Sequence, residues 1–269
     1  MTTTPRAADP VPIPIPILLY HSVSEAPPDW IAPFNVRPDA LDRHLDLMVA
    51  SGRQALTVSD LADRIDAGED VAAGSVVVTF DDGFADTAEV AAPALSARRM
   101  PATVYVTTGP LRGGRHRLQP SRMMTSSQLG DLERCGLEVG AHSETHRAMD
   151  LLSETAVRRE IEESKACLED VLGHRVRSFA YPHGHHDPGV AALVHQGGFD
   201  SACAVKNAFS SLRDDRFALA RLTVRASTTD EQLARWLRGQ GASMPPPRQK
   251  WRTRAWRHYR RLRALGDGR

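Results

Sequence analysis

The sequence predicts an α/β fold, a (β/α) barrel of about seven strands, and three observations support this fold class. Apolar runs typical of buried strands alternate along the chain with runs of helical periodicity, which indicates a mainly parallel sheet covered by helices. About seven such units in roughly 230 residues suit a barrel better than an open sheet. Polar motifs directly follow several of the strands, and this end of a barrel is where its chemistry takes place.

The expected strands are short runs of apolar and β-branched residues. The clearest covers residues 76–80, Val-Val-Val-Thr-Phe, and its continuous apolar character predicts burial on both faces. Further strands are predicted over residues 17–20, 102–106, 137–140, 178–181, 199–204 and 221–224.

The expected helices are recognised by their apolar periodicity and their capping residues. They cover residues 39–50, 59–68 with Ser59 as N-cap, about 86–99, 188–196 and 229–238, and two more begin at Thr125 and Ser153. The predicted core-facing residues are Leu41, Leu45, Met48 and Val49 in the first helix, and Ile161, Leu168 and Val171 in the helix after Ser153.

Composition and charge narrow the class of protein. Of 269 residues 41% are apolar and 25% are charged, an ordinary globular balance. The net charge of +1 is unevenly spread: nine Lys or Arg and one Asp lie in residues 248–269, a net +8, so the rest of the chain carries −7. A mildly acidic body argues against nucleic acid as the main substrate.

Cysteine usage and the first residues bear on localisation. Cys135, Cys167 and Cys203 are an odd number without a metal-like spacing, which suits a reducing compartment. Prolines interrupt the apolar residues near the start, so neither a signal peptide nor a membrane helix is recognised there. We therefore expect a cytoplasmic protein.

The first chemical motif is Asp81-Asp82-Gly83, directly after the clearest strand. Two carboxylates at the end of a buried strand are costly unless positive charge compensates them. Neighbouring residues of an extended chain point in opposite directions, so a division of labour is expected, with one carboxylate on a metal and the other beside it as a base. The alternative is that Asp82 or Asp86 only caps the next helix.

The second motif is His142-Ser143-Glu144-Thr145-His146, which also follows a strand. Histidines four residues apart lie on one side of a helical turn and are close enough to share a cation. With one aspartate they form a three-ligand set with open positions, the pattern of a catalytic metal. A pair of surface histidines is the alternative.

The third motif, Ala180-Tyr181-Pro182-His183-Gly184, again follows a strand. Pro and Gly fix a tight turn that can aim backbone N–H groups at a developing oxyanion. A loop without a chemical role is the alternative at this point.

Taken in order, TFDDG, HSETH and AYPHG resemble the motifs of the polysaccharide deacetylase family, which is carbohydrate esterase family four or the NodB-homology domain. ILLYHSV, PATVYVTTG and GGFDSA extend the resemblance over about residues 13–240. The resemblance implies a distorted (β/α) barrel, a divalent metal that is usually zinc, and hydrolysis of N-acetyl groups of a saccharide.

Carried over by position, the resemblance makes Asp82, His142 and His146 the metal ligands and Asp81 the general base. Substrate contacts are expected from Tyr181, Pro182, His183 and Gly184, and the His183 N–H or a neighbour would complete the oxyanion site.

The chain departs from the family's pattern in two places. Ala180 stands where the third motif usually has an arginine, so Asp81 must be oriented from elsewhere, and Arg221 is the candidate. The Leu-x-His element that supplies the general acid is absent, which leaves His21, His183 or Asp81 itself. For His21, a structural hydrogen bond and a catalytic role stay open.

The expected organisation is a flexible N-terminus (1–12), a catalytic domain (13–240), and a Pro-rich linker with a basic amphipathic helix (241–269). In that helix Trp, Tyr and Leu recur among arginines, which is typical either of a helix on an anionic membrane surface or of one packed on the barrel. Membrane contact would suggest a lipid-linked saccharide substrate. The alternatives to an N-deacetylase are a hydrolase of other C–N amide bonds, such as those of cyclic ureides, and an inactive glycan-binding scaffold.

Overall fold

A computed structural model describes residues 14–68, 74–114, 118 and 121–245. Its strands are β1 (Ile17–Tyr20), β2 (Ser22–Val23), β3 (Asn35–Val36), β4 (Gln54–Leu56), β5 (Ser75–Phe80), β6 (Thr103–Val106), β7 (Glu138–Ala141), β8 (Ser178–Ala180), β9 (Ser201–Cys203) and β10 (Leu222–Thr223). Its helices are α1 (Pro38–Ala50), α2 (Val58–Ala67), α3 (Ala92–Ala97), α4 (Ser126–Arg134), α5 (Glu154–Leu172), α6 (Pro188–Gln196) and α7 (Asp230–Leu237), and a π-helical turn (Thr87–Ala91) precedes α3.

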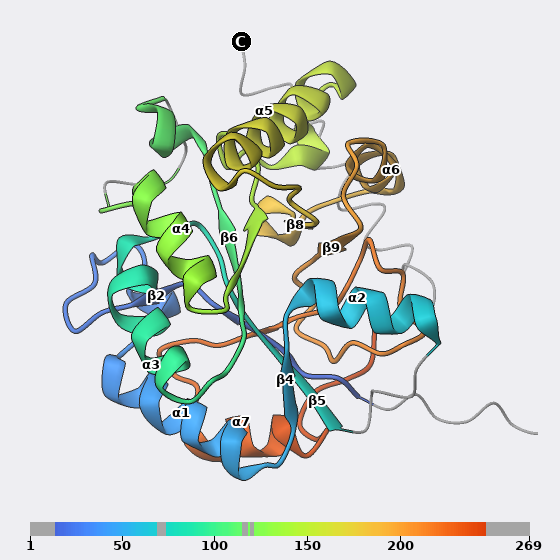
Figure 1. Ribbon diagram of the computed structural model, residues 1–269. Helices are drawn as coiled ribbons and strands as arrows, with labels where there is room; N and C mark the ends of the chain where they lie inside the picture. The colour runs from blue at the N-terminus through green and yellow to red at the C-terminus, as the bar shows by residue number, and fades with distance from the viewer. Residues whose placement is uncertain (1–13, 69–73, 115–117, 119–120, 246–269) are drawn as a thin grey trace, which may run out of the picture.

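The strands form a curved parallel sheet with helices packed around it, as predicted (Figure 1). Their order is β10-β1-β5-β6-β7-β8-β9, and β4 pairs with the first half of β5. Backbone hydrogen bonds from residues 202 and 204 to residues 216 and 219 bring the segment before β10 back to β9. The sheet thus has the form of a distorted (β/α) barrel, and the carboxyl ends of its strands meet at one edge.

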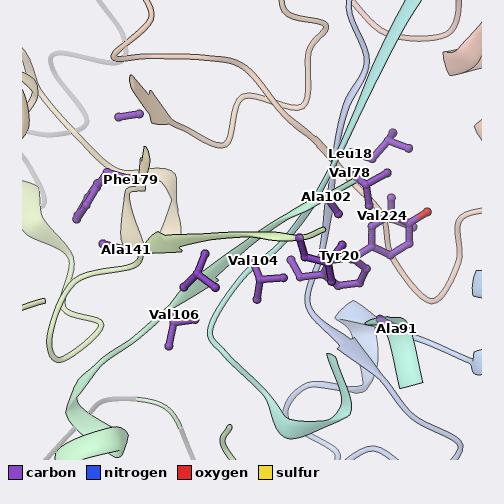
Figure 2. Packing of buried hydrophobic residues seen from close by; sticks show 14 of the residues in the cluster. Leu18, Tyr20, Val78, Ala91, Ala102, Val104, Val106, Ala141, Phe179 and Val224 are labelled. Atoms are coloured by element: carbon purple, nitrogen blue, oxygen red, sulfur yellow. The ribbon is translucent and has the colours of Figure 1, made fainter. Parts of the chain in front are cut away.

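Alternation along the strands divides the core into two clusters. Outward-facing residues such as Leu18, Val78 and Val104 pack under the helices (Figure 2). Inward-facing residues such as Val77 and Tyr105 fill the interior. Residues two apart on a strand share a face, so this alternation places the residue that follows β5 by one position, Asp81, on the inner side.

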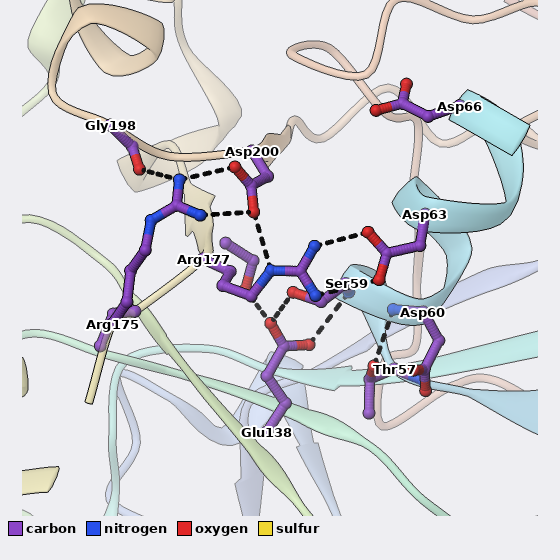
Figure 3. A network of polar contacts seen from close by, with 12 residues as sticks. Thr57, Ser59, Asp60, Asp63, Asp66, Glu138, Arg175, Arg177, Gly198 and Asp200 are labelled. Atoms are coloured by element: carbon purple, nitrogen blue, oxygen red, sulfur yellow. Dashed lines mark hydrogen bonds and ion pairs between the residues drawn. The ribbon is translucent and has the colours of Figure 1, made fainter. Parts of the chain in front are cut away.

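A polar network ties α2 to β7 and to the residues directly before β8 and β9 (Figure 3). Glu138 accepts hydrogen bonds from the Ser59 N–H and hydroxyl at 3.2 and 2.5 Å. Arg177 lies between Asp63 and Asp200, at 2.5 and 2.7 Å. Burial alone would raise the pKa of Asp200, but the neighbouring arginines hold this pKa below its ordinary value.

The elements follow the sequence prediction closely, with a few corrections. The N-cap of α2 is Thr57, not Ser59, because the Thr57 side chain accepts from the Asp60 N–H. Val49 and Val171 were expected in the core, but 55% and 36% of their surface is exposed. Val49 lies at the edge of the buried stripe of α1, and Val171 lies in the last turn of α5. The strands β2, β3 and β4 were not predicted.

No helix within the described residues is long and apolar enough to cross a membrane. The N-terminus (1–12) and nearly all of the C-terminal segment predicted as linker and amphipathic helix lie outside the described residues.

Candidate active site

The predicted motifs converge at the carboxyl edge of the sheet. Asp81 and Asp82 follow β5, the histidine motif follows β7, and the Tyr181–Gly184 turn follows β8. His21 comes directly after β1, so it belongs to the same edge. Segments far apart in the sequence therefore surround one small region.

Backbone strain concentrates at this edge. Asp82, Ser143, His146 and His183 have φ angles of 77°, 62°, 58° and 58°, in the left-handed region that residues other than glycine rarely adopt. Such conformations persist only where the surroundings enforce them, and they cluster at functional sites.

The side chains of Asp82, His142 and His146 point their potential metal-ligand atoms at one another. The Nε2 atoms of His142 and His146 lie 3.4 and 3.1 Å from Oδ1 of Asp82, and the three ligand atoms lie within 4.8 Å of each other. Two ligands about 2.1 Å from one tetrahedral cation would be roughly 3.4 Å apart. All three residues are buried. The set therefore fits a divalent cation.

Hydrogen bonding supports the same assignment. Oδ1 of Asp82 is buried and, within the described chain, has no partner in hydrogen-bond geometry. The Nδ1 atom of His142 lies 2.7 Å from the Ala180 carbonyl oxygen. An Nδ1–H donated to this carbonyl leaves the Nε2 lone pair facing Asp82, which is how proteins orient a metal-binding imidazole. Burial alone would raise the pKa of Asp82, but the two imidazoles hold it well below its ordinary range.

Asp81 lies beside this set, with its Oδ2 3.7 Å from Nε2 of His142, and it is paired with an arginine. The Arg221 guanidinium donates to both carboxylate oxygens of Asp81, each at 2.7 Å, and Arg221 is fully buried. It also donates to the Ala204 carbonyl oxygen and the Thr79 hydroxyl, at 3.1 and 3.2 Å. Burial alone would raise the pKa of Asp81, but Arg221 and His142 hold this pKa below its ordinary value. The carboxylate is thus ionised and fixed in orientation beside the metal ligands.

The Tyr181–Gly184 turn offers backbone rather than side-chain contacts. Tyr181 is fully buried, and its hydroxyl donates to the Phe217 carbonyl oxygen at 2.9 Å. Hydrogen bonds within and beside the turn use the N–H groups of Tyr181 and Gly184, but not that of His183. Gly184 is required because a Cβ there would lie 2.4 Å from the backbone nitrogen of Val205. The turn is therefore held tightly against its neighbour.

The two histidines considered for proton transfer differ in environment. Nδ1 of His21 is buried with no hydrogen-bond partner among the described residues, and burial lowers the pKa of this imidazole although Asp82 and Asp81 oppose the shift. His183 is exposed as a residue, but its ring lies 4.6 Å from that of His146. Desolvation of this ring and the neighbouring imidazoles lower the pKa of His183 to about 4.

The prediction that His142 and His146 share a helical turn is wrong. The segment is an irregular loop, and His146 reaches its position because the Ser143 hydroxyl accepts its N–H at 3.0 Å. Glu160 of α5 supports the loop by accepting the Thr145 N–H at 2.8 Å and the Thr145 hydroxyl. Sequence reasoning missed Glu160. The available signal was a carboxylate on the apolar stripe of a helix, where it must find a partner.

Comparison with known proteins agrees with this fold. The polysaccharide deacetylase family profile matches residues 68–202, half of the chain. A curated relative in Bacillus subtilis (strain 168), named "Putative polysaccharide deacetylase YxkH", is 23% identical over 213 residues, which are 79% of this chain and 72% of that protein. The chain belongs to the polysaccharide deacetylase family.

Solved structures show the same fold. The Streptococcus pyogenes deacetylase PplD, determined in complex with acetate, superposes with a TM-score of 0.76 at 24% identity, covering 88% of this chain and all of PplD. IcaB from Ammonifex degensii superposes with a TM-score of 0.69 at 22% identity, covering 83% of this chain and 97% of IcaB.

Proposed function

We propose that this protein is a metal-dependent N-deacetylase, which hydrolyses the N-acetyl group of a saccharide and releases acetate and a free amine. One observation carries the proposal: the donor atoms of Asp82, His142 and His146 converge beside an ionised carboxylate, Asp81, that Arg221 holds in place. Family membership supports the substrate class.

Asp82, His142 and His146 would hold a divalent cation, and zinc suits two imidazoles and one carboxylate. When bound, such a cation lowers the pKa of a coordinated water and polarises the acetamide carbonyl. Three protein ligands leave positions open for both, as a hydrolytic site requires.

Asp81 is the base in this proposal. Its low pKa keeps the carboxylate ionised at neutral pH, and the fork of Arg221 fixes the orientation in which it would accept a proton from the attacking water. The His183 N–H would donate to the oxyanion that forms on the acetamide oxygen.

The leaving amine needs a proton, and His21 is the better-supported donor of the two histidines. Its Nδ1 has no hydrogen-bond partner in the described part of the chain, and although burial lowers the pKa of this imidazole, Asp82 and Asp81 oppose the shift. His183, with a pKa of about 4, is neutral at pH 7 and thus a weaker proton donor.

The test is acetate release by the purified, zinc-loaded protein from a panel of N-acetylated oligosaccharides. We expect release from at least one glycan, and loss of turnover with metal content retained in Asp81→Asn. Undiminished turnover in Asp81→Asn would refute the assignment of the base, and no acetate release from any glycan would refute the proposed function.

A further inference from the structure

The segment between β2 and β3, residues 24–34, is a fixed loop beside the candidate site. It begins four residues after the end of β1, and Asn35 closes it. The Asn35 side chain accepts the Ser24 N–H and donates to the Ser24 carbonyl oxygen, both at 2.9 Å, and it also accepts the Ser22 hydroxyl at 3.0 Å. Since Asn35 is buried, the two ends of the loop are pinned together. The start and the end of the loop are therefore fixed next to each other.

Two aromatic residues of this loop contact residues that flank the aspartate pair. The Phe34 ring lies 5.3 Å from the His21 ring, and the Arg225 guanidinium lies 4.6 Å above the Phe34 ring. The Trp30 ring lies 5.9 Å from the Phe84 ring at an interplanar angle of 58°. Phe84 is buried and comes two residues after Asp82. The loop thus lines one side of the site.

Trp30 keeps more of its surface accessible than Phe34, which is of intermediate burial. It keeps 36% of its surface exposed, and the described chain has two other exposed large apolar residues, Val49 and Val171, on α1 and α5. Of these three, Trp30 is the one that packs next to the aspartate pair. A single exposed apolar side chain is not unusual, but aromatic side chains commonly line ligand sites, and this one lies beside a polar site.

The chemistry of the indole identifies the ligand class. An aromatic ring has an electron-rich face, and one face of a pyranose presents polarised C–H groups. A sugar ring can therefore stack on an exposed tryptophan, while its hydroxyl groups stay in water. A small polar ligand without an apolar face gains no stabilisation from stacking on the indole.

We propose that Trp30 is a stacking platform for a sugar ring adjacent to the residue that loses its acetyl group. This inference rests on the proposed function, and it makes the substrate an oligosaccharide or longer glycan rather than a single N-acetylated sugar. The platform provides binding that is the same in the ground state and the transition state, so it acts on KM rather than on kcat.

The experiment compares Trp30→Ala and Trp30→Phe with wild type on the glycan that wild type deacetylates best, and on its monosaccharide. For Trp30→Ala we expect KM for the oligosaccharide to rise about tenfold, with kcat, metal content and melting temperature close to wild type. Trp30→Phe should lie in between. Val49→Ala, which removes exposed apolar surface on α1, is the matched control and should leave KM unchanged.

Two readouts keep this proposal separate from the proposed function. Acetate release by wild type tests the function alone. Binding of the same oligosaccharide to the Asp81→Asn protein, measured by calorimetry with and without Trp30→Ala, tests the platform without turnover. Weaker binding by about tenfold in the double variant supports the platform. Equal KM and equal binding with alanine at position 30, or a loss confined to melting temperature, overturns it.

Discussion

Replacing Arg221 with methionine tests how the base is held. The substitution keeps an apolar chain of similar length but leaves Asp81, which is 3% exposed, as a buried charge without its partner. Removing one member of a buried ion pair costs about 3–5 kcal/mol, because the remaining charge is neither solvated nor paired. For a domain of this size that corresponds to a fall in melting temperature of roughly 10 °C.

The loss of activity in Arg221→Met should be larger than the unfolded fraction of the protein explains. Without the guanidinium the pKa of Asp81 rises and its orientation is lost, so we expect kcat to drop on the order of 100-fold even below the melting temperature. Arg221→Lys should fall between wild type and Arg221→Met, because one ammonium cannot reproduce the two parallel hydrogen bonds.

The double variant Arg221→Met, Asp81→Asn provides the control. It removes the unpaired charge, so most of the lost stability should return while activity stays absent. The Ala204 carbonyl, which Arg221 also contacts, remains without this donor at a cost of about 1 kcal/mol. Urea unfolding and acetate release measure the two effects. A loss under about 1 kcal/mol in Arg221→Met would show that the ion pair does not have the energetic role assigned to it.

Three further predictions concern other parts of the chain. The pKa of Asp200 is depressed in the folded state, so its contribution to stability is present above pH ~4 and is lost as the pH falls through the folded pKa. In urea unfolding, Asp200→Asn should therefore lose less stability than wild type as the pH falls below ~4. The same pH dependence in the variant and in wild type would contradict the role of Arg177. Gly140→Ala places a Cβ 2.5 Å from Cε1 of Tyr105 and should cost about 1–3 kcal/mol, whereas a neutral result would mean that the ring moves freely. Deleting residues 247–269 should weaken binding to anionic vesicles, and the membrane hypothesis fails if binding is unchanged.

The fold and the core of the site could be predicted because their signals are local. The strand 76–80 is recognisable by its composition, and Asp81 and Asp82 lie at its carboxyl end because they directly follow it in the sequence. The role of Arg221 in orienting Asp81 was predicted because Ala180 stands where the family usually has an arginine. A buried carboxylate needs a cation, and Arg221 was the candidate in a short apolar strand.

What the sequence could not predict depends on tertiary contacts. The path of the histidine loop depends on two hydrogen bonds. Ser143 accepts the His146 N–H, and both residues have a left-handed backbone. Glu160 accepts the N–H of Thr145, which is 15 residues away. The interior position of the Tyr181 hydroxyl depends on Phe217, 36 residues away. The pairing of Trp30 with Phe84 joins two loops that no periodicity connects.

The most direct test of the central claim is the metal content of the purified protein. Elemental analysis after incubation with zinc and removal of free metal should find one ion per chain in wild type and in Asp81→Asn. It should find almost none in His142→Ala or His146→Ala, with a parallel loss of acetate release that zinc cannot restore. Full metal content in both histidine variants, or undiminished deacetylation by chelator-treated protein without metal, would contradict the account.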